Sequence, residues 1–273
     1  MPPPASIGLD PGAVAREIEA AGFGSIWVPN VNAAANMAAL EPLLAATGRL
    51  VVGTGIASVW TWSPADLAAA ADGLASRYPG RFVLGLGVSH APLVESTGQA
   101  YVRPLAKMRQ FLGELPGTAA PVVLAALGPK MLELSRDRTA GAHPYFSPPA
   151  HTEFARSVLG TEPLLVPELA VALAPGAAGA AAARAYAKFY LRLPNYTSNL
   201  RRFGFGDEDI AGDGSDRLIS AVIPNGPVAV RERLREHLDA GADHVVIQPV
   251  GDDGKFAAGD IAELGSLTAG LTC

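Results

Sequence analysis

The stretch of sequence that indicates the fold most clearly is SPADLAAAADGLASRYPGRFVLGLGVSH, residues 63–90. It begins with Ser63 and Pro64, a pattern typical of a helix N-cap followed by proline at the first helical position. The alanine-rich segment at residues 64–76 predicts a helix, and the apolar run at residues 82–87 predicts a strand. We interpret the stretch as one helix and one strand of a parallel α/β fold.

The same alternation extends in both directions along the chain. Strands are expected at residues 7–9, 25–29, 50–56, 82–87, 121–126, 142–146, 164–171 and 244–249. Helices are expected at residues 12–21, 36–46, 64–76, 102–115, 129–138, 151–159, 228–240 and 261–271. Eight strands is the number that closes a (β/α)8 TIM barrel, so the sequence predicts this α/β fold with an abbreviated first strand.

Residues 175–227 interrupt the alternation between the seventh and eighth expected strands. The segment is long enough for more than one helix, and an alanine-rich part carries Tyr186, Phe189 and Tyr190. We expect a helical insertion that can serve as a dimerisation element. Because no linker is long enough to divide the chain, we expect residues 1–273 to form a single domain. We also expect the protein to be a homodimer.

The composition excludes several classes of function. Hydrophobic residues make up 49% of the chain and charged residues 17%, so a folded core is expected. A net charge of -5 argues against nucleic acid as a partner. One cysteine, Cys273, excludes an intramolecular disulfide framework. With neither a signal peptide pattern after Met1 nor an uninterrupted membrane span, we expect a cytoplasmic protein that does not bind membranes.

In a TIM barrel the functional residues lie at the C-terminal ends of the strands and in the loops that follow. At those positions the sequence offers Asn30, Gly55, Ile56, Trp60, Trp62, Val88, Ser89, His90, Gly128, Pro129, Lys130 and Tyr145. These are the candidate site residues.

The segment GLGVSH at residues 85–90 is similar to a dinucleotide fingerprint but lacks its third glycine and the prompt helix. Its glycines are instead expected to let a ligand approach the strand backbone closely. His90 follows at a position where a barrel places an acid or base, and the alternative interpretation is a structural histidine.

Gly128, Pro129 and Lys130 stand where a strand passes into a helix. Free backbone N–H groups at a helix start, together with a lysine, are suited to binding a phosphate. The alternative is an ordinary turn in which Gly128 supplies an unusual backbone angle.

Trp60 and Trp62 are candidates to wall an apolar pocket, or alternatively to cover the barrel mouth as packing. The remaining histidines show no metal-ligand spacing, so no metal site is expected: His143, His151, His237 and His244. The sequence also lacks a G-x-S-x-G elbow and a P-loop, which disfavours a hydrolase.

Several ordered segments together resemble the bacterial luciferase-like (LLM class) superfamily, and in particular its actinobacterial branch that uses the deazaflavin coenzyme F420. The segments are GFGSIWV at 22–28, VGTGI at 52–56, residues 76–90, AALGPKML at 125–132 with AG at 140–141, LPNY at 193–196 through RFGF at 202–205, and AGADHV at 240–245. The resemblance covers about residues 12–250.

The resemblance implies an oxidoreductase that transfers a hydride between F420 and a small organic substrate. It places a non-prolyl cis peptide at Gly55 and Ile56, the coenzyme ring against residues 88–90, and the coenzyme phosphate at residues 127–130. His90 is then expected to exchange the proton that accompanies hydride transfer. Asn30, Trp60, Trp62 and Tyr145 are expected to bind substrate.

The resemblance leaves the substrate open. Asn30 and Val31 stand where sugar-oxidising members have an acidic residue followed by histidine, and His90 stands where some members have glutamate. Two other functions remain as alternatives. One is an FMN-dependent luciferase-like monooxygenase, and the other is a catalytically inactive barrel that binds a ligand.

Overall fold

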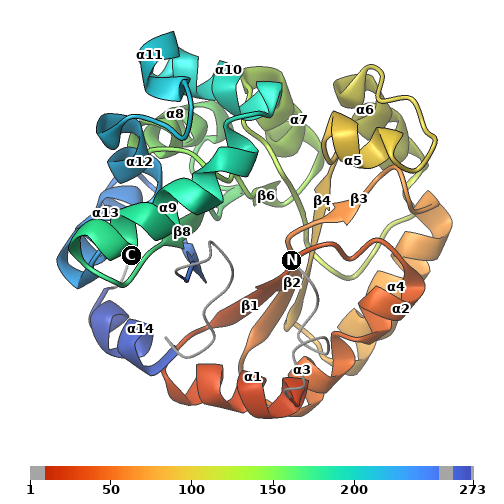
Figure 1. The fold of residues 1–273 in the computed structure, drawn as a ribbon. Helices are drawn as coiled ribbons and strands as arrows, with labels where there is room; N and C mark the ends of the chain where they lie inside the picture. The colour runs from red at the N-terminus through yellow and green to blue at the C-terminus, as the bar shows by residue number, and fades with distance from the viewer. Residues whose placement is uncertain (1–9, 252–260, 272–273) are drawn as a thin grey trace. The chain divides into compact units, whose positions relative to one another are not determined.

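The computed structural model describes residues 10–251 and 261–271, and Figure 1 labels their helices and strands. These residues form two compact units. Unit 1 contains residues 10–125 and 133–141, and unit 2 contains residues 126–132, 142–251 and 261–271. The expected first strand, at residues 7–9, lies outside the described residues. A single domain over the whole chain stays a prediction.

Unit 1 is built on a parallel sheet in the order β1-β2-β4-β5. Its strands are β1 (Ser25–Val28), β2 (Val51–Thr54), β4 (Phe82–Gly87) and β5 (Val122–Leu124), and the short β3 (Ala57–Ser58) also pairs with β4. Every pairing is parallel, and Trp27 lies in register with Gly53. Figure 1 shows β1, β2 and β4 as neighbouring arrows. The second to fifth expected strands are thereby confirmed.

The helices of unit 1 are α1 (Pro11–Ala20), α2 (Ala34–Ala38), α3 (Glu41–Ala45), α4 (Pro64–Arg77), α5 (Ala91–Glu95) and α6 (Pro104–Glu114). Ser63 caps α4 as expected, since its Oγ accepts the N–H of Asp66 at 3.1 Å. The helix expected at residues 36–46 is two helices. Pro42, in the first turn of α3, cannot donate a backbone hydrogen bond to the turn before it, which explains the break.

Three strand glycines of unit 1 make room for protein groups. A Cβ on Gly85 would lie 1.9 Å from the Thr54 carbonyl oxygen, and one on Gly53 would lie 2.6 Å from the Trp27 ring. A Cβ on Gly87 would lie 2.7 Å from the Ile56 side chain. The expectation that the glycines at 85 and 87 leave space for a ligand is therefore wrong, because neighbouring strands fill that space.

The later strands are β6 (Gly141–Ala142), which begins at the last residue of unit 1, and β7 (Leu164–Leu165), β8 (Glu168–Val171) and β9 (Val246–Pro249) of unit 2. β6 neighbours β7, and β8 pairs with β9 in parallel. The strand expected at residues 164–171 is divided in two at Pro167, which has no N–H for a sheet hydrogen bond. β6 is shorter than expected for the same reason, since Pro144 follows it closely.

The helices that follow are α7 (Pro129–Arg138), which begins in unit 2, α8 (Pro149–Leu159), α9 (Gly176–Tyr190), α10 (Pro194–Arg202), α11 (Asp207–Ile210), α12 (Asp216–Val222), α13 (Pro227–Asp239) and α14 (Ile261–Thr268). The expected helical insertion consists of α9 to α12. Ala183 and Ala187 of α9 are buried in one core cluster with Leu200 and Leu218.

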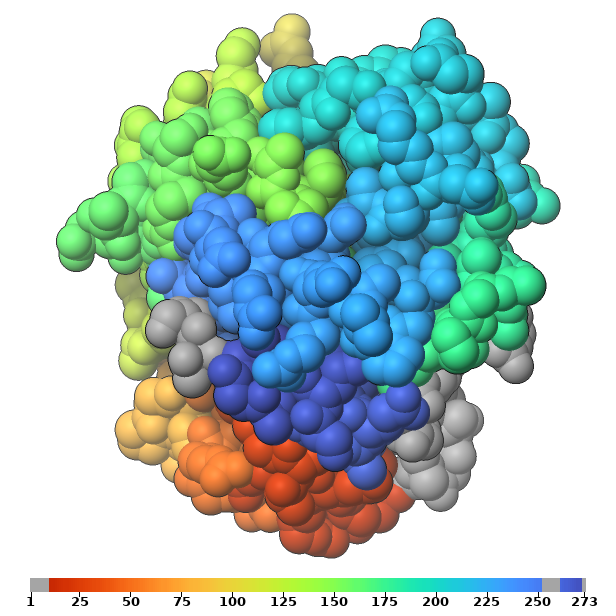
Figure 2. Space-filling view, turned by 90° about the vertical axis from the view of Figure 1, so that its left-hand side faces the viewer, coloured from red at the N-terminus to blue at the C-terminus, as the bar shows by residue number. Residues whose placement is uncertain are grey.

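Figure 2 shows α13 and α14, coloured blue and dark blue, side by side on the surface. The Arg231 guanidinium joins them by donating to the Leu267 carbonyl oxygen and, at 3.2 Å, to that of Ala269. Among the described residues, no helix has the length and apolar character needed to cross a bilayer.

Candidate functional site

The C-terminal end of β4 passes directly into the candidate segment Val88, Ser89 and His90. Ser89 has a φ of 55°, the left-handed region that non-glycine residues seldom adopt. His90 is half-buried and precedes α5, where its carbonyl oxygen accepts the N–H groups of Leu93 and Val94 at 3.0 Å each. The segment is thus an irregular turn between a strand and a short helix.

Two aromatic side chains donate hydrogen bonds to this segment. The Trp60 indole Nε1 donates to the Val88 carbonyl oxygen at 2.8 Å, and the Tyr101 hydroxyl donates to that of Ser89 at 3.3 Å. Burial raises the pKa of the Tyr101 phenol, so the hydroxyl keeps its proton. Tyr101 is not among the predicted site residues, and its one signal in the sequence is an aromatic side chain in a polar loop.

The two candidate tryptophans have different surroundings. Trp62 is 9% exposed, and its indole donates to the Val31 carbonyl oxygen at 2.8 Å. Trp60 is half-buried, with the Lys107 ammonium 5.6 Å from its ring centroid. Burial favours the packing interpretation for Trp62, whereas Trp60 keeps part of its surface exposed.

The other candidates of unit 1 follow the neighbouring strands. The peptide bond between Gly55 and Ile56, after β2, is cis, as the resemblance implies. Asn30, after β1, is exposed and has a φ of 57°. Because β1, β2 and β4 are adjacent and parallel, their C-terminal ends meet at one edge of the sheet. The structure therefore brings Asn30, Gly55 and Ile56 to the same edge as residues 88–90.

In unit 2, Leu127 and Gly128 precede α7, and Pro129 and Lys130 are its first residues. The Gly128 carbonyl oxygen accepts the N–H groups of Met131 and Leu132 at 3.1 Å each. The backbone of Gly128 is outside the left-handed region, and a Cβ there would have no neighbour within 4 Å. The alternative in which Gly128 supplies an unusual backbone angle is therefore wrong. Lys130 is exposed and forms no ion pair within the described ranges.

A buried histidine holds this loop. His151 of α8 lies with its Nε2 2.9 Å from the Leu127 carbonyl oxygen, which can only accept, so Nε2 carries a hydrogen. Burial, together with a smaller effect of the nearby Arg202 guanidinium, lowers the pKa of His151 to about 4, although the hydrogen bond to Leu127 acts in the opposite direction. His237, whose Nδ1 is 2.7 Å from the Thr152 hydroxyl, has its pKa lowered by burial to about 3. Both imidazoles are therefore neutral at pH 7.

Tyr145 lies in a cluster of phenols in unit 2. Its hydroxyl hydrogen-bonds that of Tyr186, which in turn is 3.1 Å from the hydroxyl of Tyr190. Burial raises the pKa of all three tyrosines, and the Glu168 carboxylate raises it further. They are therefore protonated at neutral pH. The sequence singled out Tyr145 but not its link to Tyr186, a contact across 41 residues.

Two more histidines of unit 2, His143 and His244, lie apart from the candidate segments in sequence. His143 is buried, with Nδ1 2.7 Å from the Val166 carbonyl oxygen and Nε2 3.4 Å from a Glu168 carboxylate oxygen. Burial lowers the pKa of His244. Across residues 10–251 and 261–271, no group of three histidine, cysteine or acidic residues is arranged to hold a metal ion.

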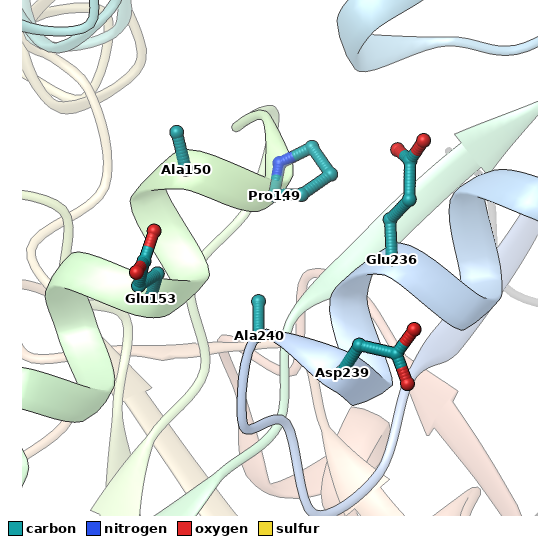
Figure 3. A pocket seen from close by; sticks show the side chains of 6 residues that line it. All are labelled: Pro149, Ala150, Glu153, Glu236, Asp239 and Ala240. Carbon is teal, nitrogen blue, oxygen red and sulfur yellow. The ribbon is translucent and has the colours of Figure 1, made fainter.

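A pocket lies elsewhere in unit 2, between α8 and α13 (Figure 3). Its lining is acidic and contains no histidine or nucleophile: Pro149, Ala150, Glu153, Glu236, Asp239 and Ala240. Carboxylates repel a phosphate-bearing coenzyme, so this pocket does not fit the expected ligand.

Comparison with known proteins gives one family. Residues 11–115 match the luciferase-like monooxygenase family. A coenzyme F420-dependent tetrahydromethanopterin reductase from Methanopyrus kandleri has a similar structure, with a TM-score of 0.72, 18% identity and coverage of 94% of each chain.

Two further solved structures are also similar. An F420-dependent secondary alcohol dehydrogenase, in complex with an F420-acetone adduct, gives a TM-score of 0.65 and 16% identity over 94% of this chain and 92% of that chain. The oxygenating constituent of 3,6-diketocamphane monooxygenase from Pseudomonas putida, in complex with FMN, gives a TM-score of 0.65 and 14% identity. That match covers 95% of this chain and 91% of that chain. The expected fold class and the resemblance to luciferase-like proteins are confirmed: the chain has the luciferase-like α/β fold, and residues 11–115 carry the sequence pattern of the luciferase-like monooxygenase family. The F420-using branch within that group stays a prediction.

Proposed function

We propose that this chain is an oxidoreductase that transfers a hydride between coenzyme F420 and a small organic substrate. The observation that carries the proposal is the edge of the unit 1 sheet, where apolar Ile56 and Val88 lie at strand ends beside the titratable His90. Flat coenzyme rings are bound by apolar surfaces with a few polar groups at fixed positions. Two structurally similar enzymes are F420-dependent, which supports the choice of coenzyme.

The loop at the start of α7 fits the coenzyme phosphate. Lys130 supplies an exposed positive charge, and the side of Gly128 is open. The first turn of a helix favours an anion, because its N–H groups point toward the ligand. Gly128, Pro129 and Lys130 would therefore hold the phosphate, and Gly55, Ile56, Val88 and Ser89 would hold the ring.

Each side chain has a separate task in the proposed reaction. When bound, F420 supplies the carbon that carries the hydride. Ile56 and Val88 exclude water, and the Asn30 amide orients the substrate by hydrogen bonds. His90 takes up or gives the proton at an imidazole nitrogen, because an imidazole titrates near neutral pH and an amide does not. Trp60 and Tyr145 are proposed to contact substrate, whereas the buried Trp62 is left to packing.

The second candidate is an FMN-dependent monooxygenase, which the matched family and the FMN-bound similar structure favour. FMN also carries a phosphate, so Lys130 fits either coenzyme.

Two further proposals, on localisation and on assembly, apply whichever coenzyme is bound. The protein is a cytoplasmic homodimer that assembles through α9 to α12, and light scattering of the purified protein against a variant lacking residues 175–227 measures the assembly.

The Lys130→Ala variant tests the phosphate contact. We expect it to weaken F420 binding by about 1 to 3 kcal/mol, because a charge-assisted hydrogen bond to phosphate is lost. Coenzyme fluorescence gives the dissociation constant. Lys188→Ala, which removes an exposed lysine from α9, is the matched control and should leave that constant unchanged. Equal dissociation constants for the Lys130 variant and the parent protein would remove Lys130 from the site.

A further inference from the structure

We propose that Trp60 and Tyr101 are positioning residues that together fix the backbone of residues 88–90 and thereby orient the His90 side chain. The inference rests on the proposed function for its catalytic meaning. Its structural content concerns unit 1 alone and is measurable without the coenzyme.

Three consecutive carbonyl groups of this segment are held by hydrogen bonds. The indole of Trp60 donates to Val88 at 2.8 Å, and the hydroxyl of Tyr101 donates to Ser89 at 3.3 Å. The third carbonyl, of His90, accepts two N–H groups from the first turn of α5. Every peptide unit from residue 88 to residue 90 is therefore fixed, and each is fixed by a different part of the chain.

The conformation of Ser89 requires such support. Its φ of 55° places the Cβ close to the following carbonyl oxygen, an arrangement that costs free energy for an L-residue other than glycine. Non-glycine residues keep this conformation where the surrounding contacts determine it. Here the hydrogen bonds to Val88 and Ser89 lie immediately before and at the left-handed residue. Removing either donor frees the segment to relax toward an ordinary turn, which would turn His90.

Trp60 is itself held firmly enough to act as a support. The Gln99 side-chain amide donates to its backbone carbonyl at 3.0 Å. The Tyr101 ring lies 5.6 Å from the Trp60 ring, and the Lys107 ammonium also lies 5.6 Å from that ring. Residues 99–107 thus contact both the backbone and the ring of Trp60. Because both its backbone and its ring are contacted, the Trp60 indole has a fixed position as a hydrogen-bond donor.

The two donors are insensitive to pH in the range where a histidine titrates. An indole N–H does not titrate, and the raised pKa of Tyr101 keeps its hydroxyl protonated. The phenol of Tyr101 contacts the segment directly, and Lys107 on α6 lies over the ring of Trp60. A change in the titration of His90 in the variants would therefore report a changed position of the imidazole.

The experiment compares Trp60→Phe and Tyr101→Phe with the parent protein. Each variant keeps an aromatic ring and loses one donor. The titration of the His90 imidazole is followed by NMR in the ligand-free protein, with His90→Gln identifying its signals. We expect the titration midpoint to move by about 0.5 pH unit in each variant, because the surroundings of the imidazole change. Tyr78→Phe removes a phenol hydroxyl elsewhere in unit 1, after α4, and should not move it.

F420 affinity supplies the second readout. A lost hydrogen bond of ordinary strength corresponds to about 2- to 10-fold weaker binding, and the double variant should lose less than the product of the two single losses, because both donors act on one segment. An unmoved His90 titration in both variants, with each folded as judged by circular dichroism, would overturn the inference. If the parent protein does not bind F420, the proposed function fails, and the His90 titration still decides the positioning role.

Discussion

Residues 88–90 of unit 1 and residues 127–130 of unit 2 are supported in the same way but by different chemistry. Both lie where the chain passes from a parallel strand to a helix, and both have carbonyl oxygens that accept hydrogen bonds from side chains. In unit 1 the donors are the indole of Trp60 and the phenol of Tyr101. In unit 2 the donor is the buried imidazole of His151.

The difference predicts which segment responds to acid. Neither donor of unit 1 changes its charge between pH 4 and pH 8. His151 does, because its pKa of about 4 lies within that range, and a proton on it would be a buried charge near Arg202. A strand-to-helix segment whose carbonyl groups are held by side chains is therefore insensitive or sensitive to acid according to the side chain that donates the hydrogen bond.

The largest expected effect is a loss of turnover caused by a substitution in unit 1. His90→Gln should lower turnover by about 10²- to 10⁴-fold while leaving F420 affinity within a few fold, because the amide cannot exchange a proton at neutral pH. Steady-state kinetics with a small organic substrate that the parent protein accepts, together with coenzyme titration, separates the two quantities. Turnover close to that of the parent would show that His90 has no part in proton transfer.

The next effect is on stability and belongs to unit 2. In the unfolded chain His151 and His237 have a pKa near 6.5, and burial lowers the pKa to about 4 and about 3 in the folded protein. Below pH 6.5 the unfolded chain therefore binds more protons, so the free energy of unfolding falls as pH decreases. At pH 4 each histidine should contribute a loss of about 3 kcal/mol relative to pH 7.

Urea denaturation at pH 7 and at pH 4 measures this loss. His151→Gln offers a side-chain N–H to Leu127 but does not titrate, so its loss between the two pH values should be smaller by about 3 kcal/mol. Comparing the two differences cancels the contribution of the carboxylates. An equal loss in the variant and the parent would show that His151 is not kept neutral by burial.

The smallest effect contrasts one glycine from each unit. Gly85→Ala should lower the free energy of unfolding by about 1 to 3 kcal/mol, since its Cβ would lie 1.9 Å from a backbone oxygen. Gly128→Ala should change stability by less than about 0.5 kcal/mol, because its Cβ would enter open space. If the phosphate lies against Gly128, the same variant should weaken F420 binding. Equal stability losses at the two positions, measured by urea denaturation, would contradict the contrast.

Local pattern predicted most of the fold. The helix and strand in residues 63–90 were predicted because hydrophobic periodicity and the Ser63 cap are local signals. Hydrophobicity alone predicts one continuous strand at residues 164–171. Pro167 divides this segment into two strands, which a rule for proline in strands would have predicted.

Position at the ends of the expected strands predicted that Asn30, Ile56 and His90 share one edge of the unit 1 sheet, but not which side chains hold the backbone there. Tyr101 contacts a residue 12 positions away and His151 one 24 positions away, and no periodic pattern encodes such pairs. The strand glycines were misinterpreted for a related reason. A glycine signals a close approach, but the sequence does not say whether ligand or protein approaches it.

The proposed function requires that the chain binds F420. A titration of the purified protein with F420 and with FMN, followed by the fluorescence of each coenzyme, tests this directly. We predict saturable binding of F420, close to one molecule per chain, with FMN displacing it poorly. Tighter binding of FMN would assign the chain to the FMN-dependent monooxygenases. Binding of neither coenzyme would contradict the account and favour a barrel that has lost catalysis.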